Sequence, residues 1–222
     1  MLRRMAWFCA LTLFAMSFAI PGVAGVVIQN ASFETPQVPP DEFHYPPVPG
    51  WTHTGTPGDG WLWHAGPVCC GGGPASSGDE GGNGQFVTMG GGYGTPGSAA
   101  WYQDLTGFIT GQSYTVTFMI ADEFNLVQPV TVSIIAGATT LSQTFYTVGG
   151  AAFWQPQNWS TNTFTFTAPA ADARLQFSVD NQPYDIGLDA ISITSPVPEP
   201  ASLLLLGGGL LSVAGRVRRR LK

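Results

Sequence analysis

A strict alternation of apolar and polar residues constrains the fold of this chain more than any other feature. From Tyr114 to Ile120 every second residue is apolar, and Thr115 and Thr117 lie between them. The segment 174–180 repeats the pattern. Successive side chains of a β-strand point to opposite faces, so each of these segments has one apolar face to bury. A helical period of 3.6 residues is not sustained in the central part of the chain, and the pattern therefore predicts strands.

Glycine and proline are abundant between the alternating segments, with 29 and 18 residues respectively. Threonine, valine and aromatic residues fill the segments themselves, a composition that is typical of short strands joined by turns. We expect eight or nine strands within residues 26–29, 84–89, 99–105, 113–121, 130–136, 141–147, 161–167, 174–180 and 187–194. Two antiparallel sheets packed face to face bury all of their apolar faces. The predicted fold is therefore all-β, a two-sheet antiparallel β-sandwich.

The N-terminal residues differ from this central part. Arg3 and Arg4 precede an uncharged stretch that ends at Ile20, and small residues follow it up to Gly25. This order of basic, apolar and small residues predicts a helical secretory signal peptide over residues 1–25, removed by a signal peptidase. A permanent N-terminal anchor is the alternative.

The C-terminal residues form a second apolar segment. Pro198-Glu199-Pro200 precedes an uncharged run over residues 201–215, and arginines and a lysine follow it. At about 1.5 Å per helical residue the run reaches roughly 23 Å, against a hydrocarbon core of about 30 Å. Three consecutive glycines at 207–209 disfavour a buried core helix. We therefore expect a short hydrophobic helix that inserts transiently in the membrane, with its basic end held in the cytoplasm.

The proline-acid-proline motif, the hydrophobic run and the basic end, in this order, resemble the PEP-CTERM sorting signal of bacteria. The resemblance covers residues 196–222. It implies processing by an exosortase-type membrane peptidase near Pro198, Glu199 and Pro200. It also implies that the body of the protein is exported, and is then released or attached at the cell surface or in an exopolysaccharide matrix.

Without these two ends, residues 26–195 make one predicted domain, and its charge is strongly acidic. Of eight basic residues, two lie in the signal and five in the tail, so Arg174 is the only one left in the body. Thirteen of the fourteen acidic residues remain, which gives the body a formal charge of −12. Phosphate binding needs clustered lysine and arginine, so nucleic acid is excluded as a partner.

A long loop region, rich in proline, glycine and tryptophan, is expected over residues 35–83. Loops of this length in a compact domain are usually functional or disordered, and the aromatic content favours an ordered, functional one. Indole rings offer flat surfaces to the apolar faces of sugar rings. Trp51, Trp61 and Trp63 in this region, and Trp154 beyond it, are therefore candidate glycan-binding residues. Filling the core is their alternative role.

Motifs that carry catalysis are absent from the sequence. It contains no Gly-x-Ser-x-Gly, no His-Glu-x-x-His and no glycine-rich phosphate loop. Acidic residues occur in adjacent pairs such as Asp122 and Glu123, but neighbours in a strand point to opposite faces and cannot act as a glycosidase pair. We therefore predict a non-enzymatic protein. A secreted hydrolase acting on polysaccharide is the alternative. The sequence does not distinguish a glycan-binding or adhesive surface protein from a purely structural coat protein.

The two ends of the predicted domain carry a further resemblance. The opening residues VVIQNASFETP and the closing strand IGLDAISIT resemble the ends of a galactose-binding-like jelly roll, the fold of many carbohydrate-binding modules. The matching positions are Asn30, Phe33, Glu34, Asp189, Ile191 and Ile193. The resemblance implies glycan binding or adhesion as the function, and a structural calcium ion between the two ends.

Asp189 supports the calcium prediction from its position in the strand. It has the same parity as Ile191 and Ile193, so a regular strand would turn its carboxylate toward the core. A buried carboxylate must be paired, hydrogen-bonded or metal-bound. Calcium held by Glu34, Asp189 and backbone carbonyls would meet this need. Backbone N–H groups at a bulge, or exposure through a register shift at Ala190, are the alternatives.

Cys69 and Cys70 are the only cysteines left once the signal is removed. Neighbouring α-carbons lie about 3.8 Å apart, whereas disulfides prefer roughly 4.4 to 6.8 Å. An exported protein favours oxidised cysteines, so a strained vicinal disulfide is one expectation. Bonds to another chain and two free thiols are the alternatives.

Overall fold

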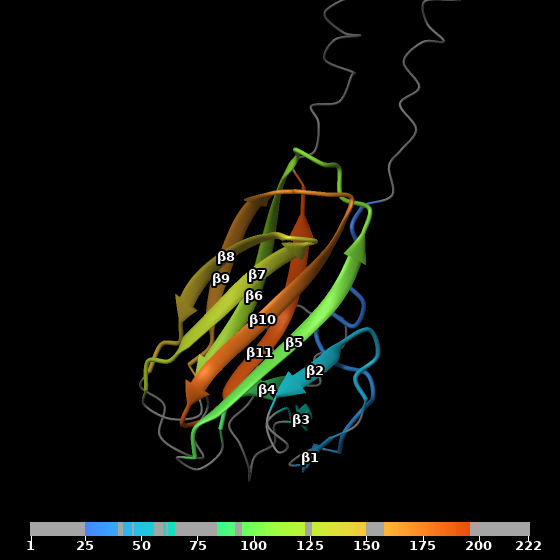
Figure 1. Cartoon of the computed structure of the whole chain (residues 1–222). Helices are drawn as coiled ribbons and strands as arrows, with labels where there is room; N and C mark the ends of the chain where they lie inside the picture. Colours follow the sequence, from blue (N-terminus) through green and yellow to red (C-terminus); the bar gives the residue numbers. More distant parts are fainter. Residues whose placement is uncertain are drawn as a thin grey trace, which may run out of the picture.

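The structure, a computed structural model, is a sandwich of two antiparallel sheets (Figure 1). It describes residues 25–39, 42–45, 47–55, 60, 62–64, 84–91, 95–122, 126–149 and 158–195. The predicted two-sheet β-sandwich is confirmed. The two terminal segments that we expected to be helical lie outside the described residues, and so do Cys69 and Cys70. No helix within the described part of the chain is long and apolar enough to span a bilayer.

Six strands form one sheet in the order β1-β3-β4-β11-β6-β9, and five form the other in the order β2-β5-β10-β7-β8. The strands of the six-stranded sheet are β1 (Glu42–His44), β3 (Leu62–His64), β4 (Gln85–Met89), β6 (Ser113–Asp122), β9 (Ser160–Thr167) and β11 (Ile186–Thr194). Those of the five-stranded sheet are β2 (Thr52–Gly55), β5 (Gly97–Thr106), β7 (Pro129–Ala136), β8 (Thr139–Tyr146) and β10 (Asp172–Gln182).

The alternation read from the sequence is what builds the core between the two sheets. Val116, Phe118 and Ile120 of β6 are fully buried, whereas Thr115 and Thr117 between them are only partly buried. β10 shows the same alternation of buried and partly exposed residues. The ring centroids of Phe118 in β6 and Phe177 in β10 lie 5.2 Å apart, so aromatic contacts join the two sheets directly.

Two expectations about secondary structure need correction. The segment 26–29 is not a strand, because a side chain rather than a neighbouring strand bonds its backbone, as described below. The segment 35–83 is not loop throughout, since β1, β2 and β3 lie within it as strands of three or four residues. The other expected strands are present, at bounds within two residues of most of those predicted.

Candidate functional site

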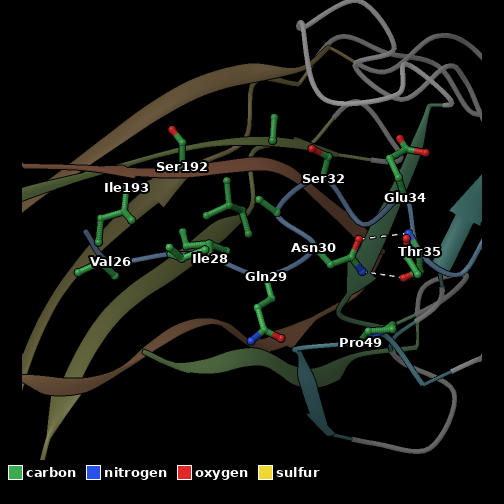
Figure 2. A pocket seen from close by; sticks show the side chains of 14 residues that line it. Val26, Ile28, Gln29, Asn30, Ser32, Glu34, Thr35, Pro49, Ser192 and Ile193 are labelled. Atoms are coloured by element: carbon green, nitrogen blue, oxygen red, sulfur yellow. Dashed lines mark hydrogen bonds between the residues drawn. The ribbon is translucent and has the colours of Figure 1, made fainter. Parts of the chain in front are cut away.

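Residues 26–39, which we call the opening segment, begin the sandwich domain and contain a turn that the Asn30 side chain closes (Figure 2). The Asn30 side-chain amide donates to the Thr35 carbonyl at 2.6 Å, and its oxygen accepts from the Thr35 N–H at 3.1 Å. The Phe33 N–H donates to the Asn30 carbonyl at 3.1 Å. Asn30 and Phe33 have φ angles of 46° and 58°, in the left-handed region that bulky residues adopt only under constraint. The turn thereby inserts the Phe33 ring into the core, where it is fully buried.

Gln85, at the start of β4, ties this opening segment to the six-stranded sheet. Its side-chain nitrogen donates to the carbonyls of Phe33 and Pro36 at 2.9 and 3.0 Å. Its oxygen accepts from the Val38 N–H at 2.5 Å. The side chain is fully buried, so water cannot replace these bonds. Sequence reasoning missed Gln85, and the only available signal was its parity with the core-facing Val87 in β4.

Gln103, in β5, ties the segment to the five-stranded sheet in a similar way. Its side-chain oxygen accepts from the Gln29 N–H at 2.8 Å, and its nitrogen donates to the Gln29 carbonyl at 3.1 Å. These are the two bonds that a neighbouring strand would make with Gln29. A side-chain amide therefore takes the place of a strand partner, which explains why residues 26–29 are extended without joining a sheet.

Trp51 completes the attachment from inside the core. Its indole N–H lies 3.0 Å from the Gln29 carbonyl and 3.2 Å from that of Asn30, and its ring lies 5.2 Å from that of Phe33. Only 7% of Trp51 is exposed. The prediction that Trp51 is a glycan platform is therefore wrong, because its faces pack against Phe33 and Phe177. Trp63 lies in β3, whereas Trp61 and Trp154 lie outside the described residues.

The opening segment and the closing strand β11 lie side by side. The Ile191 N–H donates to the Ala31 carbonyl at 2.9 Å. Between them is an open cleft of about 820 Å³, shown in Figure 2. Val26, Ile28 and Ile193 form an apolar half of its lining, and the polar half comes from Asn30, Ser32, Glu34, Thr35 and Ser192. The two ends of the domain that carry the jelly-roll resemblance are thus in direct contact.

Asp189 is buried, but not on the face that its parity predicted. β11 pairs Asp189 with Met119 of β6, and then Ser192 with Thr117, so three steps along β11 match two along β6. This bulge turns Asp189 to the face of Met119, away from the core, whereas Ile193 pairs with the core-facing Val116. Asp189 is nevertheless only 1% exposed.

The bulge also supplies the carboxylate with a hydrogen bond. The Ala190 N–H donates to Asp189 Oδ1 at 2.6 Å, and Ala190 itself has a φ of 50°. A register shift at Ala190 is thus present, as one of our alternatives required. It does not expose the carboxylate, and it makes Asp189 an acceptor for a backbone donor.

Glu34 and Asp189 each offer carboxylate oxygens, the type of ligand that a hard cation takes. The Gln85 N–H lies 3.4 Å from Glu34 Oε1. One oxygen of each carboxylate, Glu34 Oε2 and Asp189 Oδ2, is out of contact with solvent. The described residues contain no group of three or more histidine, cysteine or acidic side chains that could hold a metal. Calcium takes six to eight oxygen ligands, so backbone carbonyls or water would have to provide the remainder.

Arg174 lies on the outer face of the five-stranded sheet, where its guanidinium group already has partners. Its Nε and Nη2 donate to the two Asp104 oxygens at 2.8 and 3.1 Å, and the guanidinium carbon lies 3.7 Å from the centre of the Tyr102 ring. The Arg174 hydrogen bond lowers the pKa of Asp104, and the same bond raises the pKa of Arg174. The one basic residue of the body is thus paired with Asp104 rather than with Glu34 or Asp189.

The tail and the sandwich each match known proteins. Residues 196–220 match the PEP-CTERM protein-sorting motif, which confirms the resemblance of the tail. This motif indicates a secreted protein that is processed at its C-terminus. No curated protein sequence matches the chain significantly.

Many solved structures resemble the sandwich, and two of them illustrate the likeness. One is TmCBM61 in complex with β-1,4-galactotriose, with a TM-score of 0.53 and 15% identity over 78% of this chain and all of that one. The other is the arabinose-bound MgGH51 α-L-arabinofuranosidase, with a TM-score of 0.51 and 14% identity. That match covers 80% of this chain but only 27% of the enzyme. At such identities the likeness establishes the fold, the jelly-roll β-sandwich of carbohydrate-binding modules.

The attachment of the opening segment predicts a large cost for removing the Gln85 amide. Gln85→Met keeps the size of the side chain but leaves the Phe33 and Pro36 carbonyls and the Val38 N–H without their partner. We expect the free energy of unfolding to fall by about 2–4 kcal/mol in urea titrations. Gln176→Met, on a partly exposed position of β10, is the control and should change it by less than about 0.5 kcal/mol. Equal midpoints for the two variants would contradict this role of Gln85.

Proposed function

We propose that this protein is an exported, non-enzymatic protein of the cell surface or exopolysaccharide matrix, whose sandwich binds glycans. The observation that carries the proposal is the combination of a sorting motif at residues 196–220 with a carbohydrate-binding-module fold. Nucleic acid has no place in this function, because the body has one basic side chain, and Asp104 engages it.

The tail acts in delivery in this proposal. The signal peptide starts export, the hydrophobic segment halts in the membrane, and an exosortase-type peptidase processes the chain near Pro198, Glu199 and Pro200. The apolar run is short for a stable span, which suits a temporary stop better than a permanent anchor.

The non-enzymatic role is supported by the chemistry of the described residues. Arg174 and Asp104 are engaged with each other on a sheet face, and Asp189 accepts from a backbone N–H. Neither arrangement presents an acid and a base across a space that a glycosidic bond would occupy. A secreted hydrolase remains the second candidate, since the arabinofuranosidase shares the sandwich as one part of its chain.

In this proposal at least one of Trp61, Trp63 and Trp154 stacks on the bound sugar. Trp51 is excluded by its burial, which leaves these three as the candidates from the sequence. Trp63 lies in β3, between the edge strand β1 and β4.

An array of bacterial and plant glycans that includes β-1,4-galactan tests this function on the exported protein. We expect specific binding, and we expect Trp61→Ala, Trp63→Ala or Trp154→Ala to weaken it at least about tenfold while leaving the melting temperature unchanged. Trp51→Ala is the contrasting variant. It should lower the free energy of unfolding by about 3–5 kcal/mol, and any loss of binding should follow that loss of fold. An array without a specific signal would contradict the proposal, and release of reducing sugar would favour the hydrolase.

We also propose that a calcium ion stabilises the contact between the two ends of the domain. Glu34 and Asp189 would hold it, with backbone carbonyls completing the coordination. Calcium would neutralise two buried carboxylate oxygens in a body with a large negative charge, and it would draw the opening segment toward β11.

Thermal melting at neutral pH tests the calcium ion. EDTA should lower the melting temperature of the wild-type protein by several degrees, roughly 2–4 °C for each kcal/mol lost in a domain of this size, and calcium should restore it. Asp189→Asn should melt at a lower temperature than wild type and respond little to EDTA. Identical wild-type melts with calcium and with EDTA would mean that protein groups alone satisfy the carboxylates.

A further inference from the structure

Charged residues are absent from a long continuous part of the body. From Phe124 to Ala171 the sequence contains no lysine, arginine, aspartate or glutamate. All thirteen acidic residues of the body, and Arg174, lie outside this stretch. In a body with a formal charge of −12, a neutral segment of this length is a marked asymmetry.

The fold gathers this neutral stretch on one side of the sandwich. It contains β7, β8 and β9. β8 is the last strand of the five-stranded sheet, β9 is the last strand of the six-stranded sheet, and the two lie next to each other at the left of Figure 1. Among the described residues, no strand pairs with the outer edge of either one. Two open sheet edges therefore lie together on an uncharged side.

Within the described part of the chain, the edge at β8 lacks the usual protection against pairing. Its sequence, TTLSQTFY, contains no charge, no proline and no glycine, and its pairing with β7 runs over its whole length without a bulge. Natural proteins usually guard such an edge with lysine, proline, a bulge or a covering segment.

The phase of the β7–β8 ladder identifies the groups that face outward. The Thr147 N–H donates to the Gln128 carbonyl at 3.0 Å, in the same register as the ladder. Residues that face the partner alternate along a strand, so Phe145, Gln143 and Leu141 also direct their backbone groups to β7. The N–H and C=O groups of the alternate residues are thus directed to the outside, and these residues are Thr140, Ser142, Thr144 and Tyr146.

Exposed apolar side chains lie at one end of the same edge. Val127, Tyr146 and Val148 are 65%, 59% and 55% exposed. They belong to two segments that the bond between Thr147 and Gln128 holds together. Exposed apolar groups gathered in this way are typical of an interaction surface.

We propose that the β8 edge pairs with the β8 edge of a second copy of this chain, so that two five-stranded sheets join into one continuous sheet. An extended strand can satisfy a whole row of outward backbone donors and acceptors, and an identical edge in antiparallel orientation supplies one through a two-fold axis. Charge selects the same surface. Two sandwich domains, each with a formal charge of −12, repel each other, and this repulsion is smallest when their uncharged sides face each other. This self-association goes beyond glycan binding and does not depend on it.

Sedimentation velocity of the exported protein over a series of concentrations tests the proposal. We expect a monomer–dimer equilibrium in the wild type. Thr144→Glu places like charges in the joint, and Thr144→Pro removes an outward N–H while keeping the backbone bonds to β7. Both substitutions also remove the bond between the Thr144 and Thr131 hydroxyls on the outer face of the sheet. Each should raise the dimer dissociation constant at least about tenfold. Thr106→Glu is the matched control, because it makes the same charge change on an exposed position of β5, across the sheet from β8. It should change the constant less than about threefold.

The dependence of the dimer dissociation constant on ionic strength is a second test of the same proposal. Raising it from about 0.01 M to about 0.15 M shortens the Debye length from roughly 30 Å to 8 Å. Because the joint contains no ion pairs while the bodies repel, salt should strengthen the dimer. Far-ultraviolet circular dichroism should confirm that the variants remain folded. A wild type that is monomeric in every condition, or a dimer that Thr144→Glu and Thr106→Glu affect equally, would overturn the proposal. So would a monomer that associates only when a polysaccharide is added.

Discussion

The buried amide of Gln85 is the interaction on which the arrangement of this sandwich depends. It bonds three backbone groups of the opening segment to β4, and Gln103 bonds the same segment to β5 in the other sheet. The segment is thereby joined to both sheets, although it belongs to neither. Together with the Asn30 turn and the Trp51 indole, these bonds bring Phe33 into the core, Ala31 to the closing strand and Glu34 to the start of β4.

The sequence was informative where burial alone decides the structure. Alternation in β6 and β10 predicted strands, because a two-residue period permits only one buried face. The sequence was misleading about burial and side-chain direction at positions where a single hydrogen bond or a bulge determines them. Gln85 and Gln103 are polar residues that reasoning from composition assigns to the surface. The only signal of their burial was that they share the parity of buried apolar residues in β4 and β5. The bulge at Ala190 left no sequence signal, since alanine does not favour a positive φ, and it reversed the expected face of Asp189.

For the tryptophans, too, the sequence was informative about a whole region but not about the role of each single residue. Aromatic content favoured an ordered region after Thr35, and the strands β1, β2 and β3 lie there. The sequence could not tell which tryptophan fills the core, because a buried tryptophan and a glycan-binding tryptophan are the same residue type. Trp51 is fixed inside by its indole N–H and by Phe33. Across the molecule, the acidic residues lie outside the neutral edge formed by β8 and β9, so delivery, glycan binding and self-association would use different parts of one small chain.

The central claim of this account is that the sandwich is the working part and that the tail only directs it to the outside of the cell. Mass spectrometry of the protein recovered from the extracellular fraction tests this most directly. The account predicts a chain that begins near Val26 and ends by about Pro200, because the sandwich is complete at Thr194. Recovery of the intact VRRRLK terminus on the extracellular protein would contradict it.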